Sequence, residues 1–211
     1  MAEVLLDAGL AVLALGIAIS LRPWRGMGPG ALPAPWLGAW AITPMLWGID
    51  RYAAVPLLPP MSGAALLVLL AGWPLTVIAF VPTALVIVIA GDVGWIDALH
   101  RLVWLGVVPA TLVLALGAAC RRWLPRHVFA YILGRGFAAT LFALVVAAAL
   151  APALDPNAGA GGADVFVARL LLAFGEAFLT GMITASLVAF RPHLLATYAD
   201  GLYLPTAIAG R

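Results

Sequence analysis

The chain has 211 residues, of which 65% are hydrophobic and only 9% are charged. A soluble domain carries roughly 25% charged residues to cover its surface, so this composition excludes an ordinary soluble domain and predicts an exterior that faces lipid. Eleven arginines and nine acidic residues give a net charge of +2, which is too small and too dispersed to indicate nucleic-acid binding. The one cysteine, Cys120, excludes an internal disulfide and a cysteine-based metal cluster.

Hydrophobic runs predict an all-α, polytopic membrane protein with about seven transmembrane helices in one bundle, forming a single domain over residues 1–211. A hydrocarbon core of about 30 Å needs about 20 apolar residues in a helix. We interpret the first run as a retained helix rather than a signal peptide, because Glu3 and Asp7 stand where a signal peptide has basic residues. The predicted spans are Val4–Leu21, Pro33–Ile49, Met61–Ala71, Pro74–Ala90, Leu99–Ala119, Val128–Ala151 and Val165–Phe190.

The third of these spans is short. Pro59-Pro60 precedes it and Gly72-Trp73-Pro74 follows it. A broken hydrophobic segment at membrane depth is tolerated only where protein or a cavity covers it. The stretch Leu57–Pro74 is therefore expected to be the least lipid-exposed part of the chain.

The placement of the arginines predicts the orientation of the chain in the membrane. Seven spans put the two termini on opposite sides, and cytoplasmic segments carry the excess of positive charge. With the amino terminus outside and the carboxy terminus inside, seven arginines fall on the inner side and two on the outer side. The inner ones are Arg22, Arg25, Arg121, Arg122, Arg126, Arg191 and Arg211, and the outer ones are Arg51 and Arg101.

Glu176 is the sharpest local signal in the sequence. Counting from Arg191 at about 1.5 Å per residue places it about 22 Å from the inner surface. An ionisable group at that depth normally faces the interior of the bundle. Two interpretations remain open: Glu176 belongs to a ligand site or proton relay, or it is a hydrogen-bonded acid that locks the last span to a neighbour.

Arg135 is the second ionisable residue within an apolar run. It lies between Gly134 and Gly136, about 12 Å from the inner surface by the same counting from His127, which makes a direct pair with Glu176 doubtful. The two glycines would allow a partner helix to approach closely. We therefore assign Arg135, Gly134 and Gly136 to structural or interaction roles.

A weak metal signal lies on the outer side, where Asp92, Asp97 and His100 fall within nine residues and could converge on a cation. The competing interpretation is that Asp97 caps the fifth span. No metal site is assigned. Asp92 and His100 join Glu176 and Met61, which lies in the irregular third segment, as candidates for a substrate or ion pathway.

The sequence lacks the common nucleotide-binding and hydrolase motifs. No Walker motif, no GxSxG and no HExxH is present. A lone carboxylate without a nucleophile or a histidine pair does not make a catalytic site. We expect a protein that is not an enzyme and that holds no cofactor.

Several segments carry a likeness to a known family. Gly63-Ala64-Ala65-Leu66 through Gly72-Trp73-Pro74, followed by Gly91-Asp92-Val93-Gly94-Trp95, resembles the substrate-binding membrane subunit of cobalt and nickel energy-coupling-factor transporters. The tail resembles a proteobacterial branch of energy-coupling-factor ABC transporter permeases, and the likeness runs from about residue 60 to 204. The matching segments of the tail are Leu124–Ile132, Gly175–Met182, Arg191-Pro192 and Ala196–Tyr198.

The resemblance implies a seven-helix bundle in the bacterial inner membrane with an external amino terminus. It also implies a transmembrane coupling subunit and a pair of cytosolic ATPases as partners. The metal-binding members begin Met-His and use a further histidine ahead of a Leu-x-Gly-Ala run. Here the second residue is Ala2, and the run reads Met61-Ser62-Gly63-Ala64 without a histidine. Both imidazoles that favour nickel or cobalt are absent, so the metal site cannot be transferred to this chain.

Two hypotheses therefore stand for the function. The first is a substrate-specificity subunit of an energy-coupling-factor type uptake transporter for a transition-metal ion or another small substrate. The second is a non-transporting structural or assembly subunit that reuses this fold within a larger respiratory or photosynthetic membrane complex. Either protein would be surrounded by membrane lipid and by other membrane subunits.

Overall fold

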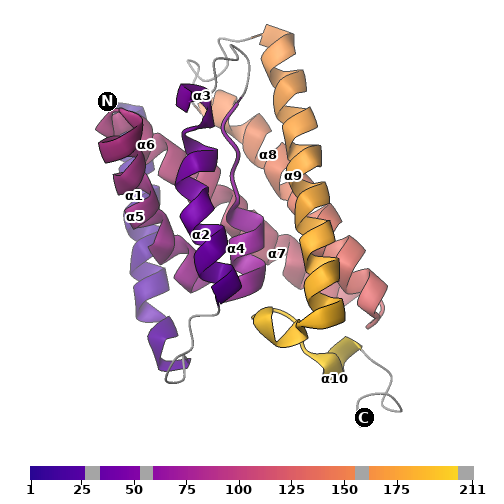
Figure 1. Cartoon of the computed structure of the whole chain (residues 1–211). Coiled ribbons are helices and arrows are strands. Elements are labelled where there is room, and N and C mark those ends of the chain that lie inside the picture. Colours follow the sequence, from indigo (N-terminus) through magenta and orange to yellow (C-terminus); the bar gives the residue numbers. More distant parts are fainter. Residues whose placement is uncertain (27–33, 53–58, 155–161, 204–211) are drawn as a thin grey trace.

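The fold of the chain is a bundle of helices, seen in a computed structural model that describes residues 1–26, 34–52, 59–154 and 162–203 (Figure 1). The described residues contain no β-strand. In chain order the elements are α1 (Ala2–Ser20), η1 (Pro23–Gly26), α2 (Ala34–Trp47), α3 (Ile49–Tyr52), α4 (Ala64–Ala71), α5 (Trp73–Gly91), α6 (Trp95–Arg101), η2 (Leu102–Val107), α7 (Val108–Trp123), η3 (Ala130–Ala138), α8 (Ala139–Leu154), α9 (Gly162–Phe190), η5 (Pro192–Leu194) and α10 (Asp200–Tyr203).

The helices define a polytopic membrane protein. Among the described residues, five helical stretches are long and apolar enough to cross a membrane. Three of them join several elements: α1 continues into η1, α6, η2 and α7 form one continuous stretch, and η3 runs into α8. The five stretches are Glu3–Arg25, Trp73–Gly91, Trp95–Trp123, Ala130–Leu150 and Asp164–Phe190.

The predicted second and third spans are helical but shorter than a membrane-crossing helix. Helix α2 has 14 residues and α4 has 8, which correspond to about 21 Å and about 12 Å of helix. The expected number of seven long spans is therefore reduced to five among the described residues. Helix α4 begins inside the bundle, at the end of an extended segment, residues 59–63, that comes down from the end of the bundle where α3 lies (Figure 1).

Helix α4 forms the centre of the hydrophobic core. Six of its eight residues are buried, and it contacts α2, α5, α7 and α9. Its sequence is apolar on every side, as expected for a helix that is surrounded by other helices. None of residues 59–74, the described part of the irregular third segment, is exposed.

Helix α9 presents two different faces. Large side chains at Leu171, Phe174, Phe178 and Met182 are each more than half exposed, as lipid-facing residues of a membrane helix would be. The opposite face carries small buried residues at the same helical spacing, which lets α9 approach η3 and α8 closely. Those small residues are Ala173, Ala177, Thr180 and Thr184.

The two ends of the bundle are distinct. Helices α1 and α9 both begin at the end called the upper end here, where α3 and α6 also lie, whereas η5 and α10 follow the lower end of α9 (Figure 1). Glu176 lies midway along α9, which is about 21 Å of helix from either end. This depth makes the surroundings of Glu176 the natural place to look for a site.

Candidate functional site

Glu176 holds the start of the half-length helix α4. Its Oε2 accepts a hydrogen bond from the backbone N–H of Ser62 at 2.9 Å, and its Oε1 accepts one from the N–H of Gly63 at 2.8 Å. These donors are backbone groups at a helix N-terminus, which have no partner within the helix. A carboxylate is well matched to them, because it accepts at both oxygens and complements the positive end of the helix dipole.

The local backbone explains why the sequence needs a glycine at this place. Gly63 adopts a φ of +67°, a left-handed conformation that side chains with a Cβ rarely adopt. A Cβ built on it would also lie 3.2 Å from the Cδ1 of Leu46. Gly63 therefore permits both the sharp entry into α4 and the approach of the two N–H groups to Glu176.

Ser62 is connected to three other elements. Its hydroxyl donates to the carbonyl of Leu105 at 2.6 Å, and its own carbonyl accepts from the indole N–H of Trp47 at 2.9 Å. The backbone groups of residue 62 are thus satisfied although they lie inside the bundle. This is the condition under which an extended segment is tolerated at membrane depth.

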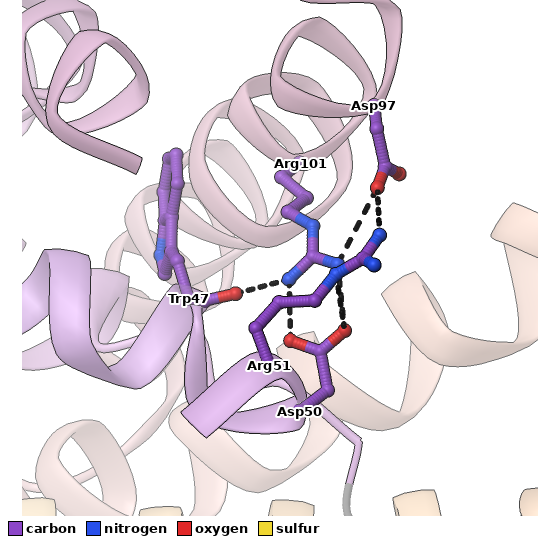
Figure 2. Close-up of polar contacts among 5 residues, drawn as sticks. All are labelled: Trp47, Asp50, Arg51, Asp97 and Arg101. Atoms are coloured by element: carbon purple, nitrogen blue, oxygen red, sulfur yellow. Dashed lines mark hydrogen bonds and ion pairs between the residues drawn. The ribbon is translucent and has the colours of Figure 1, made fainter. Parts of the chain in front are cut away.

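A second polar cluster lies above this segment, where α3 meets α6 (Figure 2). Arg101 donates to both carboxylate oxygens of Asp50, each at 2.7 Å, and also to the carbonyl of Trp47. Asp97 lies 3.5 Å from Arg101 and 3.2 Å from the exposed Arg51. The guanidinium of Arg101 is buried, and its charge is balanced by the two carboxylates.

The pKa of the Asp50 carboxyl reflects this pairing. Burial by itself raises the pKa of Asp50, but the hydrogen bonds and the positive charge of Arg101 outweigh burial. The pKa of Asp50 therefore lies below its ordinary value of 3.8. Asp50 stays ionised and attached to Arg101 throughout the physiological range of pH.

A third cluster connects α1 to α6 and η2. Asp7 is buried and accepts from the indole N–H of Trp104 at 3.0 Å, and its other oxygen lies 3.0 Å from the Nδ1 of His100. His100 is oriented by this contact, because the nitrogen facing the carboxylate is fixed while the other nitrogen is left for a different partner.

These clusters border one cavity of about 200 Å³ that reaches from Glu176 toward the upper end of the bundle. The small residues Ala147 and Ala148 of α8 and Ala173 of α9 form part of its apolar wall. Its charged and polar lining consists of Ser62, Asp97, His100, Arg101, Arg169 and Glu176. Groups of both signs thus face a single space inside the membrane protein.

The structure brings together some of the residues predicted from the sequence and separates others. Glu176 and His100 both line the cavity. Asp92 is exposed at the end of α5, with a φ of +51°, and does not line it. Met61 is not among the lining residues either, and its backbone N–H donates to the carbonyl of Leu46 at 3.1 Å.

The predicted grouping of Asp92, Asp97 and His100 is not formed. His100 contacts Asp7, and Asp97 contacts the two arginines. Within the described ranges, no three His, Cys, Asp or Glu side chains are placed to hold a metal ion. Asp97 is not the cap of α6 either, since that position is held by Gly94 and has no side-chain cap.

Arg135, Gly134 and Gly136 lie at the lower end of the bundle, within the π-helical segment η3. Gly134 lies against α7, where a Cβ would be 3.7 Å from the Sγ of Cys120. Gly136 lies against α9, where a Cβ would be 3.2 Å from the Cβ of Thr184. Arg135 is not among the residues that line the cavity with Glu176.

Four charged residues of the site were not predicted as site residues from the sequence: Asp7, Asp50, Arg101 and Arg169. Asp7 had a detectable signal, because it is an acid within an apolar run. Asp50 and Arg101 lie at predicted span ends, where a charge is ordinary. Their opposite signs at the same predicted end of the bundle are the signal that could have indicated a pair.

The fold and the site define a multi-pass α-helical membrane protein with a polar cavity inside the bundle. Comparison with known protein families, with curated proteins and with solved structures finds no match. Further conclusions on function therefore depend on the geometry of the chain itself.

Proposed function

We propose that this chain is the solute-binding membrane subunit of an uptake transporter of the energy-coupling-factor type, and that the cavity between α9 and the segment before α4 is its binding site. The cavity itself carries the proposal, because space lined by charged groups is not needed for packing alone. Pockets for small molecules combine apolar walls with a few converging polar groups, and that is the arrangement found here.

The lining favours a small polar organic solute over a transition-metal ion. Arg169 and His100 carry N–H donors, Asp97 and Glu176 carry carboxylate oxygens, and α6 and α9 each contribute one of each kind to the lining. A transition-metal site would need several nitrogen, sulfur or carboxylate ligands within bonding distance of one point, and the described residues do not gather them. A solute that carries both a donor group and an anionic group matches this lining.

From the distribution of the arginines we propose that the upper end of the bundle faces the outside of the cell. The cavity then receives its solute from the external side, as an uptake protein requires. The chain contains no ATP-binding motif, so the energy for transport comes from partner subunits: a coupling protein and its ATPases in a bacterial inner membrane.

Purification from the native host tests this proposal directly. The tagged chain is extracted in mild detergent, and the proteins that accompany it are identified by mass spectrometry. We expect an ATPase and a membrane coupling subunit at comparable stoichiometry. Recovery of the chain without any ATPase, under conditions that preserve other membrane complexes, would count against a transporter.

Two neighbouring alanines of α8 provide a matched test of the site. Ala148 lines the cavity, whereas Ala149 is exposed and does not. We expect Ala148→Leu to fill the cavity and to reduce uptake by the native transporter at least tenfold, and Ala149→Leu to leave uptake unchanged. Equal uptake by both variants would show that this cavity is not the binding site.

The second candidate function, a structural subunit of a respiratory or photosynthetic complex, is favoured by a different observation. Both oxygens of Glu176 and both terminal nitrogens of Arg101 are used for contacts within the chain. Such groups stabilise a fold without any ligand. Copurification with an electron-transfer complex in place of an ATPase would favour this function.

A further inference from the structure

A second cavity lies at the lower end of the bundle, between the end of α7 and the turn η3. Its volume is about 330 Å³. Three arginines line it, Arg121, Arg126 and Arg135, and none of the described residues that line it is acidic. These three positive charges have no role in the function proposed above.

Arg135 is the buried member of the three. It is 9% exposed, and its Nε has no hydrogen-bond partner among the described residues. A buried polar group without a partner is destabilising, and a buried guanidinium is normally paired. Arg135 also lines the cavity, so a group from outside the chain can pair with the part of its guanidinium that faces this space.

A glycine on the facing helix makes room for this arginine. A Cβ on Gly117 of α7 would lie 2.8 Å from the Nε of Arg135 and 3.3 Å from its Cζ. Helix α7 thus has no side chain where the guanidinium lies. The position of Arg135 is built by the fold and is not that of a surface side chain pointing into solvent.

The other two arginines are exposed at the mouth of the cavity. Arg121 belongs to the last turn of α7, and Arg126 to the connection that leads to η3. Trp123 and Phe129 on the same stretch are 79% and 67% exposed. Exposed aromatic residues next to arginines are typical of a segment at the depth of lipid headgroups.

We propose that this cavity binds a phosphate group, with Arg135 as the buried ligand and with Arg121 and Arg126 at the entrance. The planar guanidinium donates two parallel hydrogen bonds to a phosphate, which makes arginine the preferred residue for such groups. The phosphate belongs either to an anionic lipid or to a soluble phosphate compound. Basic pockets between helices at a membrane surface bind lipid headgroups of this kind.

Binding is measured on the purified full-length chain as the shift in thermal unfolding temperature. The probes are detergent micelles doped with phosphatidylglycerol or with phosphatidylcholine at the same molar fraction, and inorganic phosphate in undoped micelles. Arg122 provides the matched control, because it is exposed next to Arg121 and does not line the cavity. The test variants are Arg135→Gln and Gly117→Ala, the second of which keeps the charge and displaces the guanidinium.

We expect phosphatidylglycerol to raise the unfolding temperature of the wild type and of Arg122→Gln equally. Both Arg135→Gln and Gly117→Ala should bind it at least about tenfold more weakly, since a charge-assisted hydrogen bond contributes about 1.5–3 kcal/mol. A different result would be that inorganic phosphate in undoped micelles produces a saturable shift that Arg135→Gln and Gly117→Ala weaken and Arg122→Gln does not. That result would assign the site to a soluble phosphate compound. Equal losses in Arg122→Gln and Arg135→Gln, or equal shifts with phosphatidylcholine, would overturn the proposal.

The unfolding temperature of Arg135→Gln in the absence of any anion provides a second test of the proposal. Removing an unpaired buried charge should not lower the unfolding temperature of the protein in undoped micelles. A variant that unfolds far below the wild type without any anion would show that Arg135 is satisfied within the chain, and would contradict a ligand site.

Discussion

Arg101 and Asp50, 51 residues apart in the chain, form a two-pronged ion pair with both N–O distances at 2.7 Å. The pair joins the short helix α3 to α6 (Figure 2). It also draws the carbonyl end of α2 toward Arg101, because the same guanidinium donates to the carbonyl of Trp47. One buried charge thus holds the end of α2 and the short helix α3 against α6.

We expect Asp50→Asn to lower the free energy of unfolding by about 2 kcal/mol. Breaking a fully buried ion pair costs about 3–5 kcal/mol, and the Asp50 side chain is still 28% exposed. Arg51→Gln removes an exposed contact of the same cluster and should cost less than about 1 kcal/mol. Unfolding in mixed micelles, followed by circular dichroism, measures both. Equal losses of unfolding free energy in the two variants would mean that the buried ion pair contributes no more to stability than the exposed contact.

The same pair gives the protein a dependence on acid. The pKa of Asp50 is lower in the folded protein than its ordinary value of 3.8. The stability due to its ionised form is therefore complete above pH 3.8 and is lost as the pH falls through the lower pKa of the folded state. We expect the difference in unfolding temperature between wild type and Asp50→Asn to be constant from pH 7 to about pH 5, and to shrink below about pH 4. A difference at about pH 2.5 that is as large as at pH 7 would refute this.

Glu176→Gln tests the bond between α9 and the start of α4. The amide keeps the size of the carboxylate but presents one N–H₂ group, which cannot accept from the backbone N–H of Ser62 or Gly63. One buried N–H then has no partner, and we expect a loss of about 1–3 kcal/mol in the free energy of unfolding. Glu3→Gln in the exposed first turn of α1 is the control and should change it by less than about 0.5 kcal/mol.

Two glycines should respond in opposite directions to alanine. A Cβ on Gly106 in η2 would lie 2.8 Å from the Cδ2 of Phe80 and 3.0 Å from the Cη2 of Trp47. Gly106→Ala should therefore destabilise the protein by about 1–3 kcal/mol through overpacking. A Cβ on Gly16, exposed in α1, meets nothing within 4 Å. Gly16→Ala should be neutral or should stabilise by up to about 1 kcal/mol. Unfolding temperatures of the two variants decide this.

Most of the helical framework could be predicted from hydrophobicity. The expected span Pro74–Ala90 corresponds to α5, and Val165–Phe190 falls within α9. The length of α4 was harder to predict from the sequence, because its start is set by a carboxylate 114 residues further along the chain. The paired prolines and glycines around it indicated an irregular segment but not the element that covers it.

The clearest signal of the site in the sequence is a charge that interrupts an apolar run. Glu176 met that condition and lines the cavity. Arg101 did not, because it stands near a predicted span end, where arginines are common as anchors. Its partner Asp50 is on a different helix, and one sequence alone does not show which residues of distant segments meet. The same reason explains why His100 was grouped with Asp92 and was found with Asp7.

The hydrogen bonds of Glu176 have a consequence for the order of biosynthesis. Ser62 and Gly63 emerge from the ribosome more than a hundred residues before their acceptor. Until α9 enters the membrane, the start of α4 has two N–H groups without this partner, in surroundings where such groups cost several kcal/mol. Helix α4 is therefore expected to reach its final depth only when the last long helix has been inserted. In this protein the centre of the bundle is completed at the end of synthesis, and a truncated chain that stops before α9 should remain accessible to quality-control proteases.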